Sequence, residues 1–397
     1  MGVATHVEGQ TGRVLDGLSP SRTVRPASTD ELAQVIGDAD RARRAVVLWG
    51  GGTRIGVGDP PDRYDIAVDL TGLAGVVEHS PADLVCTVRA GTSLATLAEA
   101  LRASGQRWPV EAPAPERATV GGTIASAAVG PSRLRYQHPR DWIIGCVAVL
   151  GDGTITRAGG RVVKNVTGYD LTRLYSGSYG TLVAIAELTL KLAVLPERSV
   201  TLRVPSADIR TAMRTCADLR ATHLPLDALA VVNGDAAIRL GESRACVFVR
   251  VAGQHAAVER VAQTVRERTG AVPFDAPVWD RLTSLPATFD TVARASWPAG
   301  HDLPVGLDLS NALLYPGSGI AFLLGAMAVE PFTAAREAIE RAEGALVVER
   351  GDPAFKRAVG GAWGRPRVPL AIARGLKDRF DPRGVLAPGR IPLASKT

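Results

Sequence analysis

The stretch Leu48-Trp49-Gly50-Gly51-Gly52-Thr53-Arg54-Ile55-Gly56-Val57-Gly58 decides how the rest of this chain is interpreted. The run before it, 45–49, is short, apolar and rich in β-branched residues, which predicts a buried strand. A strand that ends in three glycines lets backbone N–H groups approach a bulky anion, most often a phosphate. Thr53 and Arg54 add a hydroxyl and a cation. A plain flexible turn is the alternative for this loop considered alone.

Two well-known glycine loops do not fit this stretch. The dinucleotide-binding pattern G-x-G-x-x-G needs a third glycine at the position of Ile55. The P-loop pattern, counted from Gly51, needs a lysine after Gly56, and Val57 is there instead. We therefore expect a different nucleotide-binding architecture.

Length and composition bound the possible classes of protein. The 397 residues exceed what one hydrophobic core usually covers, so we expect two domains. With 46% hydrophobic and 22% charged residues, the composition is that of a soluble globular protein. The net charge of +6 is spread along the chain without a basic arm interleaved with aromatic residues, which argues against nucleic-acid binding. One basic region lies near the end: Arg365, Arg367, Arg374, Lys377, Arg379, Arg383 and Arg390.

The cysteines and the apolar runs bear on the compartment. Cys86, Cys146, Cys216 and Cys246 are isolated, so we expect no disulfide framework, zinc site or iron–sulfur cluster on this chain. The sequence has no secretion signal at its amino terminus and no apolar run of membrane-spanning length. We expect a reducing, cytoplasmic location, with peripheral association with a membrane through partners left open.

Two further stretches of small residues follow the first loop. In the run 118–127, Gly121 and Gly122 allow a second close backbone approach at the start of a helix. Tight packing of a helix on a sheet is the alternative there. A third glycine-rich turn, 176–181, leads into a long predicted strand at 182–192. Two loops of this kind in one domain indicate a ligand longer than a mononucleotide.

The middle of the chain combines a polar run with a change of pattern. Lys164, Asn165 and Tyr169 are candidates for the same site, with a solvated loop as the alternative. After Pro196 the order becomes strand, helix, strand, strand, helix and strand, which predicts a ferredoxin-like α/β domain. That part has few glycine loops, which suits a cap over a cofactor.

The three glycine segments together resemble those of a known family. Gly50 to Thr53, Ala118 to Ala125 and Ser176 to Leu182 resemble the FAD-contacting segments of the vanillyl-alcohol-oxidase-type (PCMH) flavoproteins. The tail, Phe380 to Gly384 and Pro388 to Arg390, is similar to the closing motif of their D-2-hydroxyacid dehydrogenase branch. Within that branch, the run 163–171 and Trp363-Gly364 look most like the FAD-binding (E-type) subunit of glycolate oxidase.

The resemblance implies an α+β fold with a defined domain order. An N-terminal extension covers 1–20, and a PCMH-type FAD-binding domain of two α/β subdomains covers 21–197. A ferredoxin-like α/β cap domain covers 198–368, and a C-terminal helix and tail, 369–397, return to the FAD domain.

The resemblance also implies FAD as the cofactor and assigns residues to it. Gly50, Gly51, Gly52, Thr53 and Arg54 would cradle the pyrophosphate. The run Thr119 to Ala125, which includes Gly121 and Gly122, would contact the phosphate–ribitol region, and Val183 to Ile185 would lie along the isoalloxazine ring. Gly180 of the third segment is a further candidate contact. Relatives that attach FAD covalently carry a histidine at the position of Thr53, so non-covalent binding is implied. The tail usually has an asparagine where this chain has Ala387.

One departure from the family concerns catalysis. Competent D-2-hydroxyacid dehydrogenases of this fold carry closely spaced histidines before Gly-Asp-Gly-Asn in the cap. Here His223, His255 and His301 are isolated and that tetrapeptide is absent, so we expect no metal site. Lys164 and Tyr169 are the remaining candidates for catalytic roles.

The function implied is that of an FAD-binding subunit of an oxidoreductase. It would oxidise a small 2-hydroxy acid of the glycolate or D-lactate type together with a second flavoprotein subunit and an iron–sulfur subunit. The alternatives are a non-catalytic, flavin-stabilised scaffold subunit and a stand-alone FAD-dependent alcohol or sugar oxidase. The sequence leaves open which acid is the substrate, which acceptor takes the electrons, which subunit oxidises the substrate, and the stoichiometry.

Overall fold

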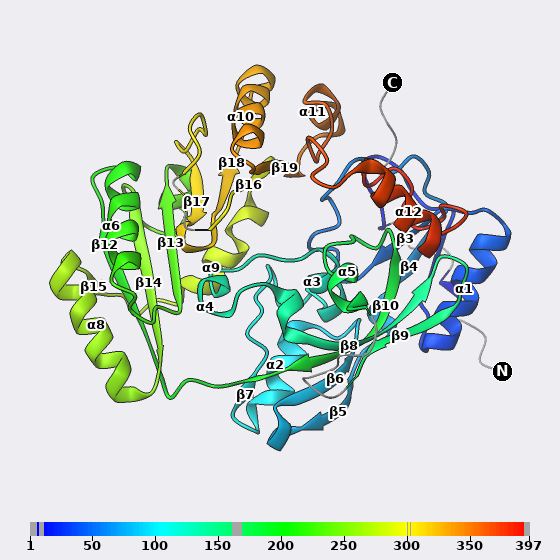
Figure 1. The fold of residues 1–397 in the computed structure, drawn as a ribbon, viewed down its shortest axis with the longest axis horizontal. Helices are drawn as coiled ribbons and strands as arrows, with labels where there is room; N and C mark the ends of the chain where they lie inside the picture. Colours follow the sequence, from blue (N-terminus) through cyan, green and yellow to red (C-terminus); the bar gives the residue numbers. More distant parts are fainter. Residues whose placement is uncertain (1–5, 8–11, 161–168, 300, 302, 393–397) are drawn as a thin grey trace. The chain divides into compact units, whose positions relative to one another are not determined.

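The computed structural model describes residues 6–7, 12–160, 169–299, 301 and 303–392, and its chain divides into two compact units (Figure 1). Unit 1 comprises Met1–Ala128, His138–Val194 and Pro366–Thr397, and unit 2 comprises Val129–Gln137 and Leu195–Arg365. The chain therefore passes between the units four times, at 128/129, 137/138, 194/195 and 365/366. The domain limits expected from the sequence stay predictions.

The first sheet of unit 1 carries the glycine loop at the end of a strand. Its order is β1-β2-β4-β3, in which β2 (Arg22–Val24), β4 (Ile66–Asp69) and β3 (Val46–Trp49) are parallel and β1 (His6–Val7) is antiparallel to β2. Before β3 comes the helix α1 (Thr29–Arg41). Its N-cap residue is Ser28, whose Oγ accepts the N–H of Glu31 at 3.1 Å. The Glu31 carboxylate in turn accepts the N–H of Ala27 at 2.9 Å. The side chains of Ser28 and Glu31 therefore each bind a backbone N–H at the start of the helix.

The second sheet of unit 1 is antiparallel and buried on two faces. Its order is β5 (Val76–Ser80), β6 (Val85–Arg89), β10 (Val183–Lys191), β8 (Ile143–Leu150) and β9 (Ile155–Gly159). On β10, Val183 and Ile185 share a core with α2 (Leu94–Arg102) and α3 (Val120–Ala125), whereas Ala184 and Ala186 pack in the core of α1. A register shift against β8 between Ile185 and Glu187 marks a bulge in β10.

The C-terminal tail completes the first sheet. After α12 (Leu370–Phe380), the segment 385–387 lies parallel to β3, with Val46 donating to the Val385 carbonyl and accepting from Ala387, both at 2.8 Å. Val385 and Leu386 are fully buried in the core that also holds α1. Unit 1 also contains the paired β7 (Gln106–Arg107) and β11 (Ala193–Val194), and α5 (Leu171–Tyr175).

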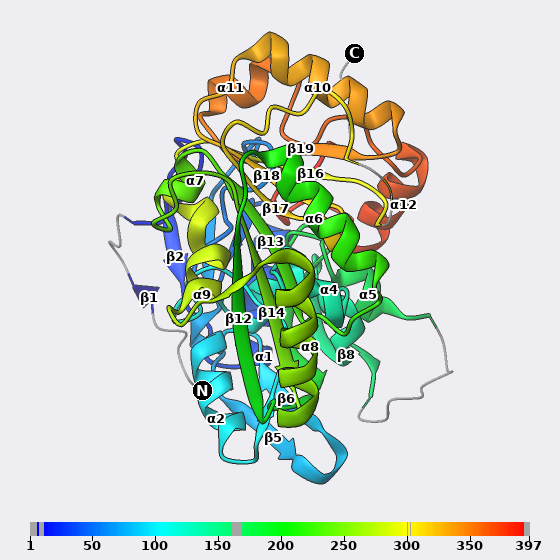
Figure 2. The same cartoon turned by 90° about the vertical axis from the view of Figure 1, so that its left-hand side faces the viewer.

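Unit 2 is built on one antiparallel sheet of eight strands. Their order is β15 (Val272–Pro273), β12 (Arg198–Pro205), β14 (Cys246–Gly253), β13 (Ala228–Asn233), β17 (Ala312–Tyr315), β18 (Ile320–Leu324), β16 (Val292–Ser296) and β19 (Ala345–Arg350). One face packs on α6 (Ile209–Ala221), α8 (His255–Thr269) and α10 (Val329–Arg341), as Figure 2 shows for α6 and α8. The other face packs on α7 (Asp235–Ile238) and α9 (Val278–Ser284). The short α4 (Arg133–Tyr136) and α11 (Pro353–Ala358) also belong to this unit.

The strand order of the ferredoxin-like pattern expected from the sequence occurs twice in this sheet. The strands β12 to β15 lie in the order fourth, first, third, second, and β16 to β19 repeat that order from the opposite edge. The sequence analysis missed β16 and β17 because they are short and because Arg294 interrupts the apolar run of β16. Arg294 is neutralised by Glu349 of β19, with 2.5 Å between Nε and Oε1.

Three observations bear on the expected chemistry. All four cysteines are buried free thiols. In the part of the chain that the structure describes, no three acidic, histidine or cysteine side chains are grouped to hold a metal ion. Among the same residues, no helix combines the length and apolarity that crossing a bilayer requires.

Candidate cofactor site

A cavity that opens to solvent lies in unit 1 where the three glycine segments meet. The cavity is lined by every cofactor residue predicted from the sequence, namely Gly50, Gly51, Gly52, Thr53, Arg54, Thr119, Gly121, Gly122, Ala125, Gly180 and Ile185. The structure thus brings together residues that lie more than a hundred positions apart in the chain.

The glycines of the first two segments allow backbone to approach backbone. A Cβ on Gly50 would lie 2.3 Å from Oγ1 of Thr119, and one on Gly121 would lie 2.6 Å from Cβ of Ala90. Both distances are far inside van der Waals contact, so only glycine fits at either position. For Gly121, the tight packing of a helix on a neighbouring strand end, left open in the sequence analysis, is what the structure contains.

The two segments differ in the backbone donors that they offer to a ligand. At the start of α3, the N–H groups of Val120, Gly121 and Gly122 are bonded to the Thr92 carbonyl, the Ala90 carbonyl and Thr119 Oγ1. In the described part of the chain, by contrast, no acceptor is found for the N–H groups of 51–53. The first glycine loop therefore provides free N–H donors for a ligand, whereas the backbone at the start of α3 contributes only to the shape of the cavity wall.

Side chains add polar and charged groups to the cavity wall. The Oγ1 atom of Thr123 is buried there without a hydrogen-bond partner, although the residue is only 2% exposed. The charged residues that line the cavity, Arg54 and Arg390, are both cations. An anionic ligand with further hydrogen-bonding groups would match this lining.

The third segment is held against the end of α3 in a strained conformation. Tyr179 has a φ of +52° and donates its N–H to the Ala125 carbonyl at 2.8 Å. The next residue, Gly180, has a φ of +70°, where a side chain would be strained, and a Cβ would lie 3.2 Å from Leu48. A bulky residue with positive φ beside a cavity is a frequent feature of ligand sites.

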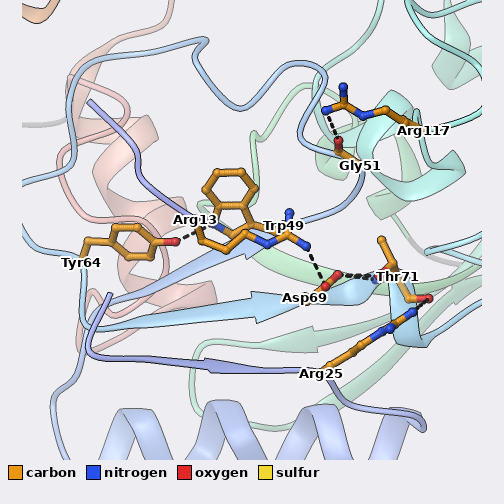
Figure 3. A network of polar contacts seen from close by, with 8 residues as sticks. All are labelled: Arg13, Arg25, Trp49, Gly51, Tyr64, Asp69, Thr71 and Arg117. Atoms are coloured by element: carbon orange, nitrogen blue, oxygen red, sulfur yellow. Dashed lines mark hydrogen bonds and ion pairs between the residues drawn. The ribbon is translucent and has the colours of Figure 1, made fainter. Parts of the chain in front are cut away.

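A polar network supports the strand ends from which the first loop starts (Figure 3). The indole N–H of Trp49 donates to the hydroxyl of Tyr64 at 2.6 Å, and Arg13 lies over the Trp49 ring. Arg13 also pairs with the buried Asp69 at 2.7 Å, and Asp69 accepts the N–H and hydroxyl of Thr71. Burial raises the pKa of Tyr64 to about 12, which keeps its hydroxyl protonated.

The tail is fastened beside the cavity by one buried ion pair. Asp381, 1% exposed, accepts the N–H groups of Val385 and Leu386 and pairs with Lys377 at 2.5 Å. Lys377 also donates to the Thr181 carbonyl at 2.7 Å and thereby joins the tail to the third segment. Burial lowers the pKa of Lys377, and the Asp381 carboxylate opposes that shift.

Of the two residues predicted to be catalytic, the described one, Tyr169, does not line this cavity. Tyr169 is 94% exposed. Asp170, which follows it, caps α5 by accepting the N–H of Arg173. Lys164 lies outside the described residues. Among the described lining residues, none carries an imidazole, carboxylate, amine or thiol.

Several lining residues were not singled out from the sequence, among them Tyr179, Thr123 and Arg390. Tyr179 and Thr123 stand inside segments that the sequence analysis identified, but neither residue type signals positive φ or an unpartnered hydroxyl. Arg390 was noted only as one of several basic residues and as the end of the tail motif. Its position in the cavity depends on a contact across most of the chain, which no local pattern indicates.

Comparison with known proteins agrees with this geometry. Residues 20–159 match the model of a family described as an FAD binding domain. Over 370 residues, the chain is 31% identical to glycolate oxidase subunit GlcE of Escherichia coli K12, covering 92% of this chain and 96% of that protein. The chain belongs to the family of glycolate oxidase subunit GlcE. It is an FAD-binding member of an oxidoreductase family, as the resemblance implied.

This GlcE family member is also similar to proteins that are not GlcE subunits. Glycolate oxidase subunit GlcD of Bacillus subtilis 168 is 31% identical over 205 residues, which are 52% of this chain and 44% of that protein. The solved structure of p-cresol methylhydroxylase with substrate bound superposes with a TM-score of 0.70 over 94% of this chain and 88% of that one. At 15% identity this likeness concerns the fold, and it confirms the predicted PCMH-type α+β class.

The residues around the cavity fit FAD. The N–H donors of the first loop and the side chain of Arg54 match a pyrophosphate, and Thr123 Oγ1 supplies a buried polar group that lacks a partner. Val183, Ile185 and Leu48 form an apolar wall against which a flat ring system can lie.

Proposed function

We propose that this GlcE-type chain binds FAD non-covalently in the cavity of unit 1 and serves as one subunit of a complex that oxidises a small 2-hydroxy acid, with glycolate as the first candidate. The observation that carries the proposal is the convergence of the three glycine segments on one cavity whose charged lining residues are both arginines. The GlcE and GlcD names of relatives support the substrate class and the assembly of several subunits.

We assign the cofactor residues as follows. The N–H groups of 51–53 and the side chains of Thr53 and Arg54 would hold the pyrophosphate. Thr119, Gly121, Gly122 and Ala125 would shape the passage for the ribitol chain, where Thr123 Oγ1 would find its partner. Gly180 and Ile185 would border the isoalloxazine ring.

When bound, FAD would supply the acceptor for a hydride, and the chain's residues would position it and exclude water. Abstraction of a substrate proton needs a base with a pKa near the working pH. The described lining residues offer no such base. We do not assign this role to Tyr169, because its side chain is exposed to solvent. Lys164 has no assigned role in this proposal, and its substitution is part of the test.

Because the described lining residues include no base, we propose that oxidation of the substrate depends on partner subunits. We propose a second flavoprotein subunit, of the GlcD type, and an iron–sulfur subunit that carries electrons onward. The chain's four cysteines are buried apart from one another in strands and a helix, so they are unsuited to bind a cluster. A cytoplasmic location, expected from these reduced thiols, is part of the same proposal.

The test compares the chain alone with the assembled complex. The purified, FAD-loaded chain should reduce an artificial dye with glycolate or D-lactate hardly above background, and activity should appear on adding both partner subunits. Lys164→Ala and Tyr169→Phe should leave the activity of the complex within about twofold, and substitution of the first loop should abolish it. Fast turnover by the isolated chain that is lost in Lys164→Ala would make this chain the catalytic subunit and contradict the proposal.

The absence of a base among the described lining residues also favours one alternative function. A non-catalytic scaffold subunit, stabilised by FAD, would also have glycine loops without a base. In that case, a flavin analogue that cannot be reduced, loaded into this subunit alone, would leave the activity of the complex unchanged. Loss of activity with that analogue would support a redox role.

A further inference from the structure

The side chain of Arg390 lies at the centre of the contacts that hold the first glycine loop, residues 50–58. Its Nη2 donates to the carbonyls of Ile55 and Val57, and its Nη1 donates to the carbonyl of Asp59 at 3.0 Å. The Asp59 N–H returns a bond to the Arg390 carbonyl at 3.2 Å. One guanidinium from the tail therefore binds three backbone carbonyls at the exit of the loop, those of residues 55, 57 and 59.

The charge of Arg390 is balanced from the opposite end of the chain. Its Nη1 pairs with Asp16 at 3.0 Å, and the two side chains are 5% and 7% exposed. Asp16 does not line the cavity, whereas Arg390 does. A buried pair of this kind is costly to break, because removing one partner leaves the other charge without compensation.

The segment that carries Asp16 is itself anchored to the strands of the first sheet. Leu15, 3% exposed, packs with Val47, Trp49 and Tyr64 beneath the loop. Arg13 pairs with Asp69 and lies over the Trp49 ring. Residues 13–16, which the sequence analysis left without a role, are thus built into the base of the loop.

We propose that Arg390 and Asp16 are positioning residues that set the geometry of the first glycine loop, so that affinity for FAD depends on contacts between the two terminal segments. This inference rests on the proposed assignment of the loop to the pyrophosphate. Bonds from Arg390 to the carbonyls of Ile55 and Val57 fix the backbone just after 51–53. That fixed exit holds the N–H groups of 51–53, which have no acceptor in the described part of the chain, in place for the anion. Asp16 acts at a distance, by holding Arg390 in place.

The chain offers a matched control for this pair. Arg383, also in the tail, pairs with Asp40 at 3.0 Å and donates to the Asp40 carbonyl, but it touches neither the loop nor the cavity. Arg383→Gln removes a tail ion pair without touching the loop. Asp16 has a φ of +48°, which asparagine tolerates well, so Asp16→Asn removes the charge without new backbone strain.

The experiment measures the Kd for FAD by flavin fluorescence in deflavinated full-length chain, and the melting temperature of each apoprotein. We expect Asp16→Asn and Arg390→Gln each to weaken FAD binding by at least about tenfold, whereas Arg383→Gln changes the Kd by less than about twofold. The double variant Asp16→Asn/Arg390→Gln should be no weaker than Arg390→Gln alone, because the two residues act as one unit.

The outcomes separate this inference from the proposed function. If the wild-type chain binds no FAD, the proposed function itself fails. If it binds FAD and all variants bind it equally, only the positioning role fails. An unchanged Kd in Asp16→Asn with a weakened one in Arg390→Gln would mean that Arg390 touches the cofactor directly, which also overturns the role proposed for the pair. Should Arg390→Gln not fold, Asp16→Asn alone decides.

Discussion

A Cβ atom on Gly51 would lie 1.7 Å from the carbonyl oxygen of Arg117. The Arg117 guanidinium also donates to the Gly51 carbonyl at 3.1 Å, so the first loop and the segment before α3 are in contact along their backbones (Figure 3). The sequence suggests that Gly51 is glycine because a phosphate must come close. In the structure, another part of the same chain already requires it, before any ligand is considered.

This contact changes what substitution of Gly51 should do. The sequence alone predicts that valine at Gly51 or Gly122 would abolish FAD binding and leave the apoprotein folded. We now expect Gly51→Ala to destabilise the apoprotein by about 3 kcal/mol or more, because a backbone carbonyl cannot yield. Gly122→Ala should cost less, about 1 kcal/mol, since its Cβ would displace only a side-chain atom, Thr119 Oγ1, at 2.9 Å. Thermal denaturation of the apoproteins measures both.

The control for that comparison is Gly375, in the middle of α12, where a Cβ would have no neighbour within 4 Å. Gly375→Ala should stabilise the apoprotein by up to about 1 kcal/mol, through helix propensity alone. If Gly51→Ala melts like the wild type, the contact with Arg117 is not rigid.

A second prediction concerns the linkage of the cofactor. With Thr53 at the position where covalent relatives carry a histidine, we expect acid or heat denaturation to release intact FAD into the supernatant. The absorbance spectrum and chromatographic retention of the released flavin measure this. A precipitate that remains yellow after washing would contradict non-covalent binding.

A third prediction follows from the backbone of Ala387, which lines the cavity with a φ of +45°. A left-handed conformation is costly for alanine and free of strain for glycine. We expect Ala387→Gly to raise the stability of the apoprotein by about 0.5 kcal/mol or more. Ala371→Gly in α12 should have the opposite effect, a loss of about 1 kcal/mol. Equal changes in the two melting temperatures would show that Ala387 is unstrained.

A fourth prediction uses the buried thiols. Burial raises the pKa of Cys146 and of Cys216 to about 12, from an ordinary value of 9.0. As the pH rises above 9, the unfolded chain loses these protons first, so stability that is fully present below pH 9 declines toward pH 12. At pH 8 a thiol reagent should label none of the four cysteines in the native chain and all four after denaturation. Rapid labelling of the native chain would show that a thiol is accessible.

The features predicted correctly from the sequence are those that a short stretch encodes. The three glycine segments and the strand β10 were each visible within about a dozen residues. The pairing of the tail with β3 and the contact of Asp16 with Arg390 were not, because each joins segments more than 300 positions apart. Tyr169 was selected for its residue type, and type alone does not say whether a side chain faces a cavity or solvent.

The strand-like segment 385–387 has a consequence for the order in which the protein is completed during synthesis. It pairs with β3 and buries Val385 and Leu386, yet it leaves the ribosome after every other element of both units. Unit 2 contains nothing beyond Arg365, so all of its strands can be paired while the tail of unit 1 is still being made. The unit that begins first is thus the last to close, and a nascent chain acquires its cofactor cavity only once translation has passed Arg390.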